Sequence, residues 1–343
     1  MLKKILIGLK TFIFLGGLYS CSHSEPLNMQ AHYFGSNPSQ IIWLQIPGLH
    51  EEHLAMLRFA YGSLKQRSAF ESALCLGKAW NYNLTELRSG AIYGPISQIN
   101  SKREIKGNCE DFSRPAVWNF FQDRGYKVTL FEVGANKKSS LIRSGSCKVE
   151  AGKKPFLQGV TYFSMGKAPA RSKFFHHTET RELLPGTYYD RSCQKGACFS
   201  SVTQNIEFSF RRSGGSKGRS FVLIRDFRFV NALKHKNIIK AKEVLFSLEQ
   251  MLKRTLKKND LDKTLVLVSA PGGRPIEFPL KGVDWELFER NGSKIIYKRD
   301  SLIGTVFAWG SRSENFCGIY EETDIGKRLM TPREVIYSKK SFF

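Results

Sequence analysis

Histidine and cysteine are the side chains of this sequence whose spacing could build a metal site. His50 and His53 lie one helical turn apart, just after the first predicted strand, where two imidazoles could share a zinc ion. A solvated helix face is the alternative interpretation of this pair. His176 and His177 are adjacent in a predicted loop and lack chelating spacing, so we expect a surface pair. No two cysteines have the Cys-x-x-Cys spacing of zinc or redox sites.

The seven cysteines point instead to disulfide chemistry and to lipid attachment. The leader described below assigns Cys21 to lipid, which leaves an even number of cysteines for pairing. In an oxidising compartment an even number favours disulfide bonds. Cys193 and Cys198 are close enough in sequence to bridge a short loop. The partners of the remaining four cysteines stay open at this stage: Cys75, Cys109, Cys147 and Cys317.

Residues 1–20 are typical of a lipoprotein signal peptide. Lys3 and Lys4 form a positive start, and an apolar stretch too short to span a bilayer ends in Leu18-Tyr19-Ser20-Cys21. We therefore expect the mature chain to begin at Cys21, outside the cytoplasm, and to be held at a membrane by lipid on that residue. An uncleaved membrane anchor is the alternative. Ser22 resembles the sorting residue of outer-membrane lipoproteins, so the periplasmic face of a bacterial outer membrane, or the cell surface, is the expected location.

A strong positive charge is the main compositional signal. The formal net charge is +23, and it is +20 once the three lysines of the leader are removed. Such an excess favours anionic partners such as lipid head groups, lipopolysaccharide, anionic polymers or phosphorylated molecules, whereas we expect no specific nucleic-acid partner. A generally basic surface is the alternative. Two groups of basic residues could form an adhesive surface: Arg211, Arg212, Lys217 and Arg219, and Lys234, Lys236, Lys240 and Lys242.

The elements that must position these residues alternate between strands and helices. Short apolar runs predict buried strands at 41–46, 126–133, 220–224, 264–268 and 305–308, and amphipathic periodicity predicts a long helix at 238–256. Such alternation predicts an α/β fold with a mostly parallel central sheet flanked by helices on both faces. Asn291-Gly292 lies between two apolar runs and predicts a hairpin with a type I′ turn.

The predicted organisation is one domain behind a leader and a tether. The tether covers 21–39, and a single domain covers 40–343. Within it, residues 134–218 show no sustained period, and we expect an insert of loops and short β elements there.

The segment near the C-terminus resembles the closing segment of alkaline phosphatases. It runs from an apolar strand into Ala308-Trp309-Gly310, then Asn315-Phe316-Cys317-Gly318 and Asp324-Ile325-Gly326. Residues 262–273 are similar to the family's TLVIVTADHG strand, and Ile41 to Gly48 to its first strand. Residues 79–90 are similar to its nucleophile helix, which closes in Thr-Gly where this chain has Ser89-Gly90. The resemblance implies an alkaline phosphatase-like α/β fold.

The same resemblance implies loss of the catalytic groups. The family uses metal ions, usually two zincs, held by Asp and His, with a Ser or Thr nucleophile. By resemblance Trp80 stands at the nucleophile position, where we expect it to fill the vacated pocket, and Ala79 at the preceding Asp. The other substituted positions are Pro47 for a metal Asp, Pro271-Gly272 for the Asp-His pair, and Arg299 for the last His. No catalytic residue and no cofactor are expected.

Three residues keep polar side chains near the family's remaining metal positions. Taking His235 as the family histidine, Asn231 replaces a metal Asp and Asp226 replaces a Glu that binds magnesium. Such a set cannot close a zinc site, which needs three or four ligands. Asp226 and His235 are therefore metal candidates, for zinc or magnesium, only if the site is rearranged.

These observations favour a membrane-anchored, exported pseudoenzyme. Its basic cleft would bind phosphate-bearing or other anionic ligands, with Arg299 and Asn231 as candidate binding residues. A scaffold whose cleft binds nothing is an alternative. Another is an active phosphomonoesterase or phosphodiesterase with Thr85 or Ser89 as nucleophile and Asp226 and His235 as metal ligands. A polyanion-binding surface protein is the remaining alternative.

Overall fold

The structure is a computed structural model that describes residues 37–60, 67–85, 87–148, 155–165, 181–184, 187–189, 218–280 and 282–330. The described residues belong to one compact unit. His176, His177, Cys193, Cys198, Arg211, Arg212 and Lys217 fall outside the described residues, as do the leader and most of the tether. No helix in the described ranges combines the length and the apolar character needed to cross a membrane.

The core of the chain is a ten-stranded sheet in the order β12-β2-β11-β8-β1-β7-β3-β4-β6-β5. Strands β8, β1, β7, β3 and β4 run parallel, and β11 runs antiparallel between β8 and β2. The strands are β1 (Gln40–Gln45), β2 (Cys75–Trp80), β3 (Lys127–Val133), β4 (Val160–Met165), β5 (Arg181–Leu184), β6 (Thr187–Tyr189), β7 (Ser220–Asp226), β8 (Thr264–Ser269), β11 (Ile303–Gly310) and β12 (Gly318–Glu321). The predicted mostly parallel sheet is confirmed.

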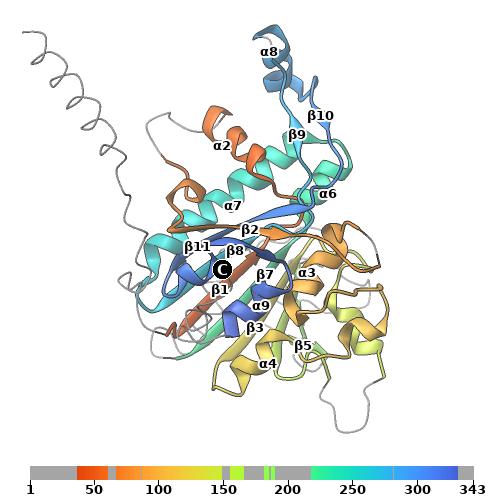
Figure 1. Cartoon of the computed structure of the whole chain (residues 1–343), viewed down its shortest axis with the longest axis vertical. Helices are drawn as coiled ribbons and strands as arrows, with labels where there is room; N and C mark the ends of the chain where they lie inside the picture. Colours follow the sequence, from red (N-terminus) through yellow and green to blue (C-terminus); the bar gives the residue numbers. More distant parts are fainter. Residues whose placement is uncertain are drawn as a thin grey trace, which may run out of the picture. The chain divides into compact units, whose positions relative to one another are not determined.

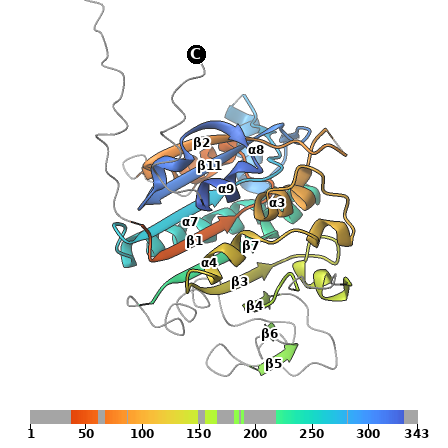
Figure 2. The ribbon, with the colours of Figure 1, turned by 60° about the horizontal axis from the view of Figure 1, so that its bottom comes forward.

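Helices cover both faces of this sheet because its central strands are apolar on both sides. In β1, Ile42 and Leu44 point to one core and Ile41 and Trp43 to the other. The first core is covered by α2 (Leu54–Ala60), α6 (Arg228–Lys234) and α7 (Ile238–Lys258). The second is covered by α3 (Gly90–Asn100), α4 (Val117–Gln122) and α9 (Asp324–Met330). Figures 1 and 2 show the sheet between these two sets.

The strands β1, β2, β3, β7, β8 and β12 all end at the same side of the sheet, which we call the carboxyl edge. In α/β sheets of this kind, the turns that leave the carboxyl ends of the strands carry the functional groups. The turns after β1, β7 and β8 and the segments before α3 and β11 therefore frame the candidate site.

The predicted hairpin at residues 285–297 is wrong. Trp285 and Phe288 lie in the helix α8 (Gly282–Asn291), where their spacing puts both against Phe278. Gly292 has a φ of +72° and its amide donates to the Phe288 carbonyl at 2.8 Å, so Asn291-Gly292 ends this helix. The strand β10 (Ile296–Tyr297) pairs instead with β9 (Ile276–Glu277), and Figure 1 shows the three elements extending beyond the sheet.

The expected nucleophile helix at residues 79–90 is also wrong. Ala79 and Trp80 end β2, whose side chains alternate between buried and exposed as in a half-buried strand. The helix α3 begins only at Gly90. Trp80 does not fill a pocket, since 41% of its surface is exposed. The resemblance thus placed the start of a helix eleven residues before the helix that the structure has.

Two disulfide bonds lie within the described residues, as the cysteine count favoured. One joins Cys75 in β2 to Cys317, just before β12, and the other joins Cys109 to Cys147. The corresponding Cα atoms are 5.2 and 5.5 Å apart, within the usual range for disulfides. In the insert, residues 141–146 form a 3-10 helix, and β4, β6 and β5 extend the sheet beyond β3.

Candidate functional site

The turns after β1 and β8 are hydrogen-bonded directly to each other at the carboxyl edge. The Gly48 amide donates to the Pro271 carbonyl, and the Arg274 amide donates to the Gly48 carbonyl, both at 3.0 Å. A Cβ atom on Gly273 would lie 2.9 Å from the Leu49 carbonyl oxygen. The two turns therefore lie backbone to backbone, without space for an ion between them.

The start of α3 packs against the same turn. Gly272 has a φ of +59°, and a Cβ atom there would lie 2.3 Å from the carbonyl carbon of Gly90. A side chain at this position would therefore have to displace the first residue of α3. Pro47 and Pro271, in the same two turns, carry no side-chain ligand atom.

Asp226, at the end of β7, is neutralised by an arginine. Its carboxylate is fully buried, and Arg228 binds both oxygens, with Nη2 at 2.6 Å from Oδ2 and Nε at 3.0 Å from Oδ1. Burial lowers the pKa of Arg228, but the Asp226 carboxylate outweighs burial and leaves this pKa above its ordinary value. The pair is self-contained, so Asp226 is not free to bind a divalent cation.

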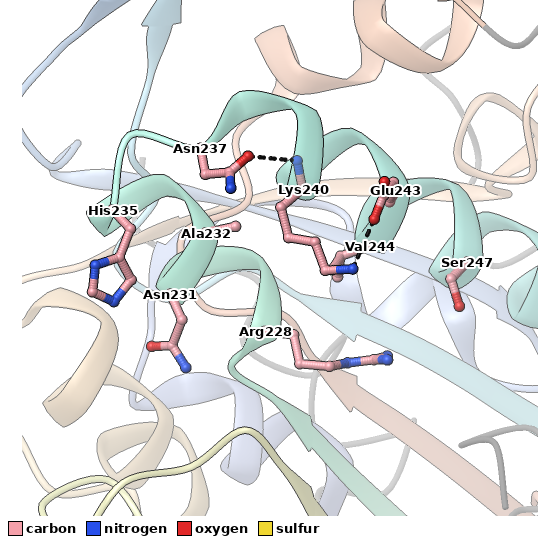
Figure 3. Close-up of a pocket in the computed structure, with 9 residues that line it drawn as sticks. All are labelled: Arg228, Asn231, Ala232, His235, Asn237, Lys240, Glu243, Val244 and Ser247. Atoms are coloured by element: carbon pink, nitrogen blue, oxygen red, sulfur yellow. Dashed lines mark hydrogen bonds and ion pairs between the residues drawn. The ribbon is translucent and has the colours of Figure 1, made fainter. Parts of the chain in front are cut away.

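Asn231 and His235, which the resemblance grouped with Asp226, do not converge on it. The Asn231 amide donates to the Gly134 carbonyl at 2.8 Å, and His235 is exposed after the end of α6. Figure 3 shows both side chains and Arg228 along α6, on one side of an open groove of about 610 Å³ whose other side is α7. Lys240 and Glu243 of α7 form an ion pair of 2.7 Å in this groove.

A zinc pair does not fit the residues present. The two turns that would carry its ligands are closed, and the Asp226 carboxylate is held by Arg228. Among the described residues, no group of three or more His, Cys, Asp and Glu side chains is placed to hold a metal ion. Zinc or magnesium could bind only after rearrangement of these turns.

His50 and His53 do not form a shared metal site either. His53 is fully buried, its Nδ1 accepts the His50 amide at 3.0 Å, and its ring packs edge-on against Phe229 at 5.0 Å. Burial lowers the pKa of His53 to about 3, so the ring is neutral. The solvated helix face proposed for this pair is wrong for His53, which belongs to the core. Burial also lowers the pKa of His50, although Glu51 and Glu52 act in the opposite direction.

Glu322 forms a buried polar corner with the start of α3, which no sequence motif indicated. Glu322, Ser89 and Asn81 are all buried, and a Cβ atom on Gly94 would lie 2.9 Å from the Glu322 Oε2 and 3.2 Å from the Ser89 Oγ. Burial raises the pKa of Glu322 to about 8, against a smaller opposing effect of Ser89. Neither candidate nucleophile is placed for attack, since Ser89 is enclosed and the Thr85 hydroxyl donates to Asn83 Oδ1 at 2.9 Å.

Three cations gather around one carboxylate in front of the closed turns. Arg274 Nε lies 2.9 Å from the Asp300 Oδ1, and Arg88 Nε donates to the Asp300 carbonyl at 2.6 Å. Lys234, the last residue of α6, is close enough to interact electrostatically with both Arg274 and Asp300. We call Arg88, Lys234 and Arg274, with Asp300 between them, the cation cluster. Three positive charges against one negative charge leave a net charge of +2.

The cation cluster lies at the surface, where Arg88 and Lys234 are exposed and Arg274 and Asp300 are half-buried. Burial raises the pKa of Asp300, although Arg274, Lys234 and Arg88 each lower it. Burial likewise lowers the pKa of Lys234, and Arg274 lowers it further, whereas Asp300 raises it. Excess positive charge gathered in one place on the surface attracts anions. Arg299, the predicted binding residue, is exposed next to Asp300 in sequence.

The comparisons with known proteins concern the fold alone. No family model matches the sequence, and no curated protein does. An alkaline phosphatase from the Antarctic bacterium TAB5 is similar in structure at 13% identity, with a TM-score of 0.59 over 86% of this chain and 98% of that one. A cold-active alkaline phosphatase from Shewanella sp. gives 11% identity and a TM-score of 0.59 over 85% and 98%. The Thermus thermophilus alkaline phosphatase is 12% identical in sequence, with a TM-score of 0.58 over 90% of this chain and 94% of that one.

Proposed function

We propose that this chain, whose fold is that of alkaline phosphatases, is an exported, lipid-anchored protein that binds anionic ligands at its carboxyl edge and does not hydrolyse phosphate esters. The observation that carries the proposal is the cation cluster, with its net charge of +2 beside the closed turns. The ligand would be a phosphate- or sulfate-bearing group of a small molecule, of lipopolysaccharide or of an anionic polymer.

The chemistry of the cluster suits an oxyanion. Arg274 and Arg88 each use Nε toward Asp300, and within the described residues their terminal nitrogens make no hydrogen bond. Guanidinium groups with free terminal N–H donors bind two oxygens of one anion, and the Lys234 ammonium adds a point charge. The side chains of Arg274 and Asp300 are 28% and 29% exposed, so a ligand can reach them from solvent.

Absence of hydrolysis is proposed from the side chains that occupy the strand ends. Metal-dependent hydrolysis of a phosphate ester requires a bound cation to polarise the ester and activate the nucleophile. Pro47 and Pro271 offer no ligand atom, and Arg228 holds the Asp226 carboxylate. Ser89 lies in an enclosed corner where no substrate phosphorus could approach its hydroxyl.

Anion binding is tested on the purified full chain in detergent by calorimetric titration with sulfate and with inorganic phosphate. We expect saturable binding that weakens as sodium chloride is added, because the attraction is electrostatic. Arg274→Gln should weaken binding about tenfold, since it removes one charged partner of the anion. Arg254→Gln, which changes an exposed arginine of α7, is the matched control and should leave binding unchanged. Absence of saturable binding would overturn the proposal.

Hydrolysis is tested on the same preparation with p-nitrophenyl phosphate and bis-p-nitrophenyl phosphate in the presence of zinc and magnesium. We expect no release of p-nitrophenol above the buffer rate. A rate that follows protein concentration and disappears with a chelator would show an active hydrolase instead.

Export and lipid attachment are supported by the leader sequence and by the two disulfide bonds, which form in oxidising compartments. Metabolic labelling with a radioactive fatty acid, followed by membrane fractionation, tests both. The wild-type chain should carry label and sediment with membranes, whereas Cys21→Ser should carry no label. Label on the Cys21→Ser variant would exclude this residue as the attachment point.

A further inference from the structure

Asp300 already occupies the position that an external anion would take in the cation cluster. Its Oδ1 faces Arg274 at 2.9 Å. Its Oδ2 lies over the first residue of α3, since a Cβ atom on Gly90 would be 3.7 Å away. The N-terminus of an α-helix attracts negative charge because its amide groups point outward. The carboxylate thus pairs with a guanidinium and has its other oxygen near the first residue of a helix.

The backbone around Asp300 is fixed, whereas its side chain is partly exposed. The Ser301 amide donates to the Gly273 carbonyl at 2.7 Å, and the Ile303 amide donates to the Ser301 hydroxyl at 3.1 Å. Arg88 holds the Asp300 carbonyl. A ligand would therefore displace the carboxylate by rotation of one side chain, without movement of the segment that carries it.

We propose that Asp300 is a built-in competitor for this anion site, so that an external anion binds Arg274, Arg88 and Lys234 only when the Asp300 carboxylate leaves Arg274 or takes up a proton. This inference rests on the proposed function and adds its regulation: anion binding tightens as the pH falls.

The direction of the pH effect follows from the charges that face Asp300. Arg274 comes from the turn after β8, Lys234 from α6, and Arg88 from the segment before α3, and all three stay positive in mild acid. Burial raises the pKa of Asp300, so its carboxylate takes up a proton at a higher pH than that of a free aspartate. A protonated Asp300 leaves three positive charges without a competing carboxylate. Protonation of Asp300 favours binding of the anion, and binding of the anion favours protonation of Asp300. The affinity for the anion therefore rises as the pH falls through the pKa of Asp300.

The experiment is a calorimetric titration of the full chain with sulfate between pH 4.5 and 7 at constant ionic strength. Sulfate is chosen because it remains a dianion over this range. For the wild-type chain we expect the dissociation constant to fall as pH falls. For Asp300→Asn we expect binding about tenfold tighter at pH 7 and a weaker dependence on pH, because the competing charge is gone. His50, another titratable residue, lies next to Gly273 in the same turn as Arg274. It is present in both the wild-type chain and the Asp300→Asn variant, so the difference between their pH profiles reports on Asp300 alone.

Asp260→Asn is the matched control. Asp260 pairs with Lys263 at 3.1 Å, at the opposite end of β8 from the cation cluster. The Asp260→Asn substitution therefore removes an ion pair of similar length and leaves the cluster intact. It should bind sulfate as the wild-type chain does.

The outcomes separate this inference from the proposed function. If the wild-type chain and Asp300→Asn both fail to bind sulfate, anion binding itself is wrong. If the wild-type chain binds sulfate and Asp300→Asn binds no more tightly and keeps the same pH profile, anion binding stands and competition by Asp300 is wrong. If Asp300→Asn does not fold, as judged by its melting curve, Asp300→Ser replaces it. A wild-type dissociation constant that does not change with pH would overturn the inference without any variant.

Discussion

At the scale of single residues, Glu322 is a buried carboxyl group with no cation beside it among the described residues. Burial holds its pKa at about 8, so it is neutral in the folded chain at neutral pH. In the unfolded chain its pKa is near the ordinary value of 4.5. Its contribution to stability is therefore fully present below about pH 4.5 and is lost as the pH rises through about 8. Glu322 thus favours folding in mild acid and opposes it in mild alkali.

Glu322→Gln should remove this pH dependence, because the amide keeps the shape of the neutral acid and cannot ionise. We expect the free energy of unfolding at pH 8.5 to rise by about 2–4 kcal/mol over the wild-type chain. At pH 4.5 it should change by less than about 1 kcal/mol. Urea denaturation at the two pH values measures both. Glu289→Gln, an exposed residue of α8, is the control and should be neutral at both. Equal destabilisation by Glu322→Gln at both pH values would contradict the buried neutral acid.

The residues of the site were only partly predictable from the sequence. Asp226, Asn231 and His235 were singled out by the family resemblance, and they lie at the end of β7, in α6 and just after α6. Arg88, Lys234 and Arg274 come from three separated segments, and only the three-dimensional fold brings them to Asp300. One local signal existed: Arg274 stands two residues after Gly272, in the turn that lacks its expected metal ligands.

At the scale of elements, periodic apolar runs predicted the structure where burial decides it. The strands β7, β8 and β11 and the long helix α7 lie where the apolar pattern placed them, within two residues at each end. Predictions failed where the sequence of a short segment is compatible with more than one type of secondary structure. Trp285 and Phe288 suit one face of a helix as well as a strand, and packing on Phe278 selected the helix.

Because the turn after β8 touches the start of α3, adding one methyl group at Gly272 should strongly lower the stability of the fold. Gly272→Ala would place a Cβ atom 2.3 Å from the Gly90 carbonyl carbon, at a φ of +59°. We expect the free energy of unfolding to fall by about 3 kcal/mol or more, because both clash and backbone strain oppose folding. Gly125→Ala is the control: φ is +77° there, but no atom lies within 4 Å of the added Cβ.

The control variant should lose about 1 kcal/mol, the conformational penalty alone. Urea denaturation of the two variants measures the difference. If both lose the same amount, the close approach of Gly272 and Gly90 is not part of the folded state in solution.

At the scale of the whole molecule, the disulfide bonds link segments far apart in the chain. Cys75 and Cys317 are separated by 242 residues, so their bond closes most of the domain into one loop, whereas Cys109 and Cys147 are separated by 38. A cross-link restricts the unfolded chain more when it closes a longer loop.

Loss of the longer cross-link should therefore weaken the fold more. Replacing Cys75 and Cys317 by serine should lower the free energy of unfolding by about 5 kcal/mol, and replacing Cys109 and Cys147 by about 4 kcal/mol. Equilibrium denaturation of both double variants, without reductant, measures the two losses. Equal losses would show that restriction of the unfolded chain does not govern the stability of this domain.

The hydrogen bonds between the turns after β1 and β8 have a consequence for anyone who would engineer phosphatase activity into this scaffold. Substituting aspartate for Pro47 and Pro271 and histidine for Gly272 would supply the missing metal ligands but no space for a metal ion between them. The Gly48–Pro271 and Gly48–Arg274 hydrogen bonds would have to break, and α3 would have to retreat from Gly272. A designed zinc site would therefore require rebuilding of these turns before the choice of ligands could matter.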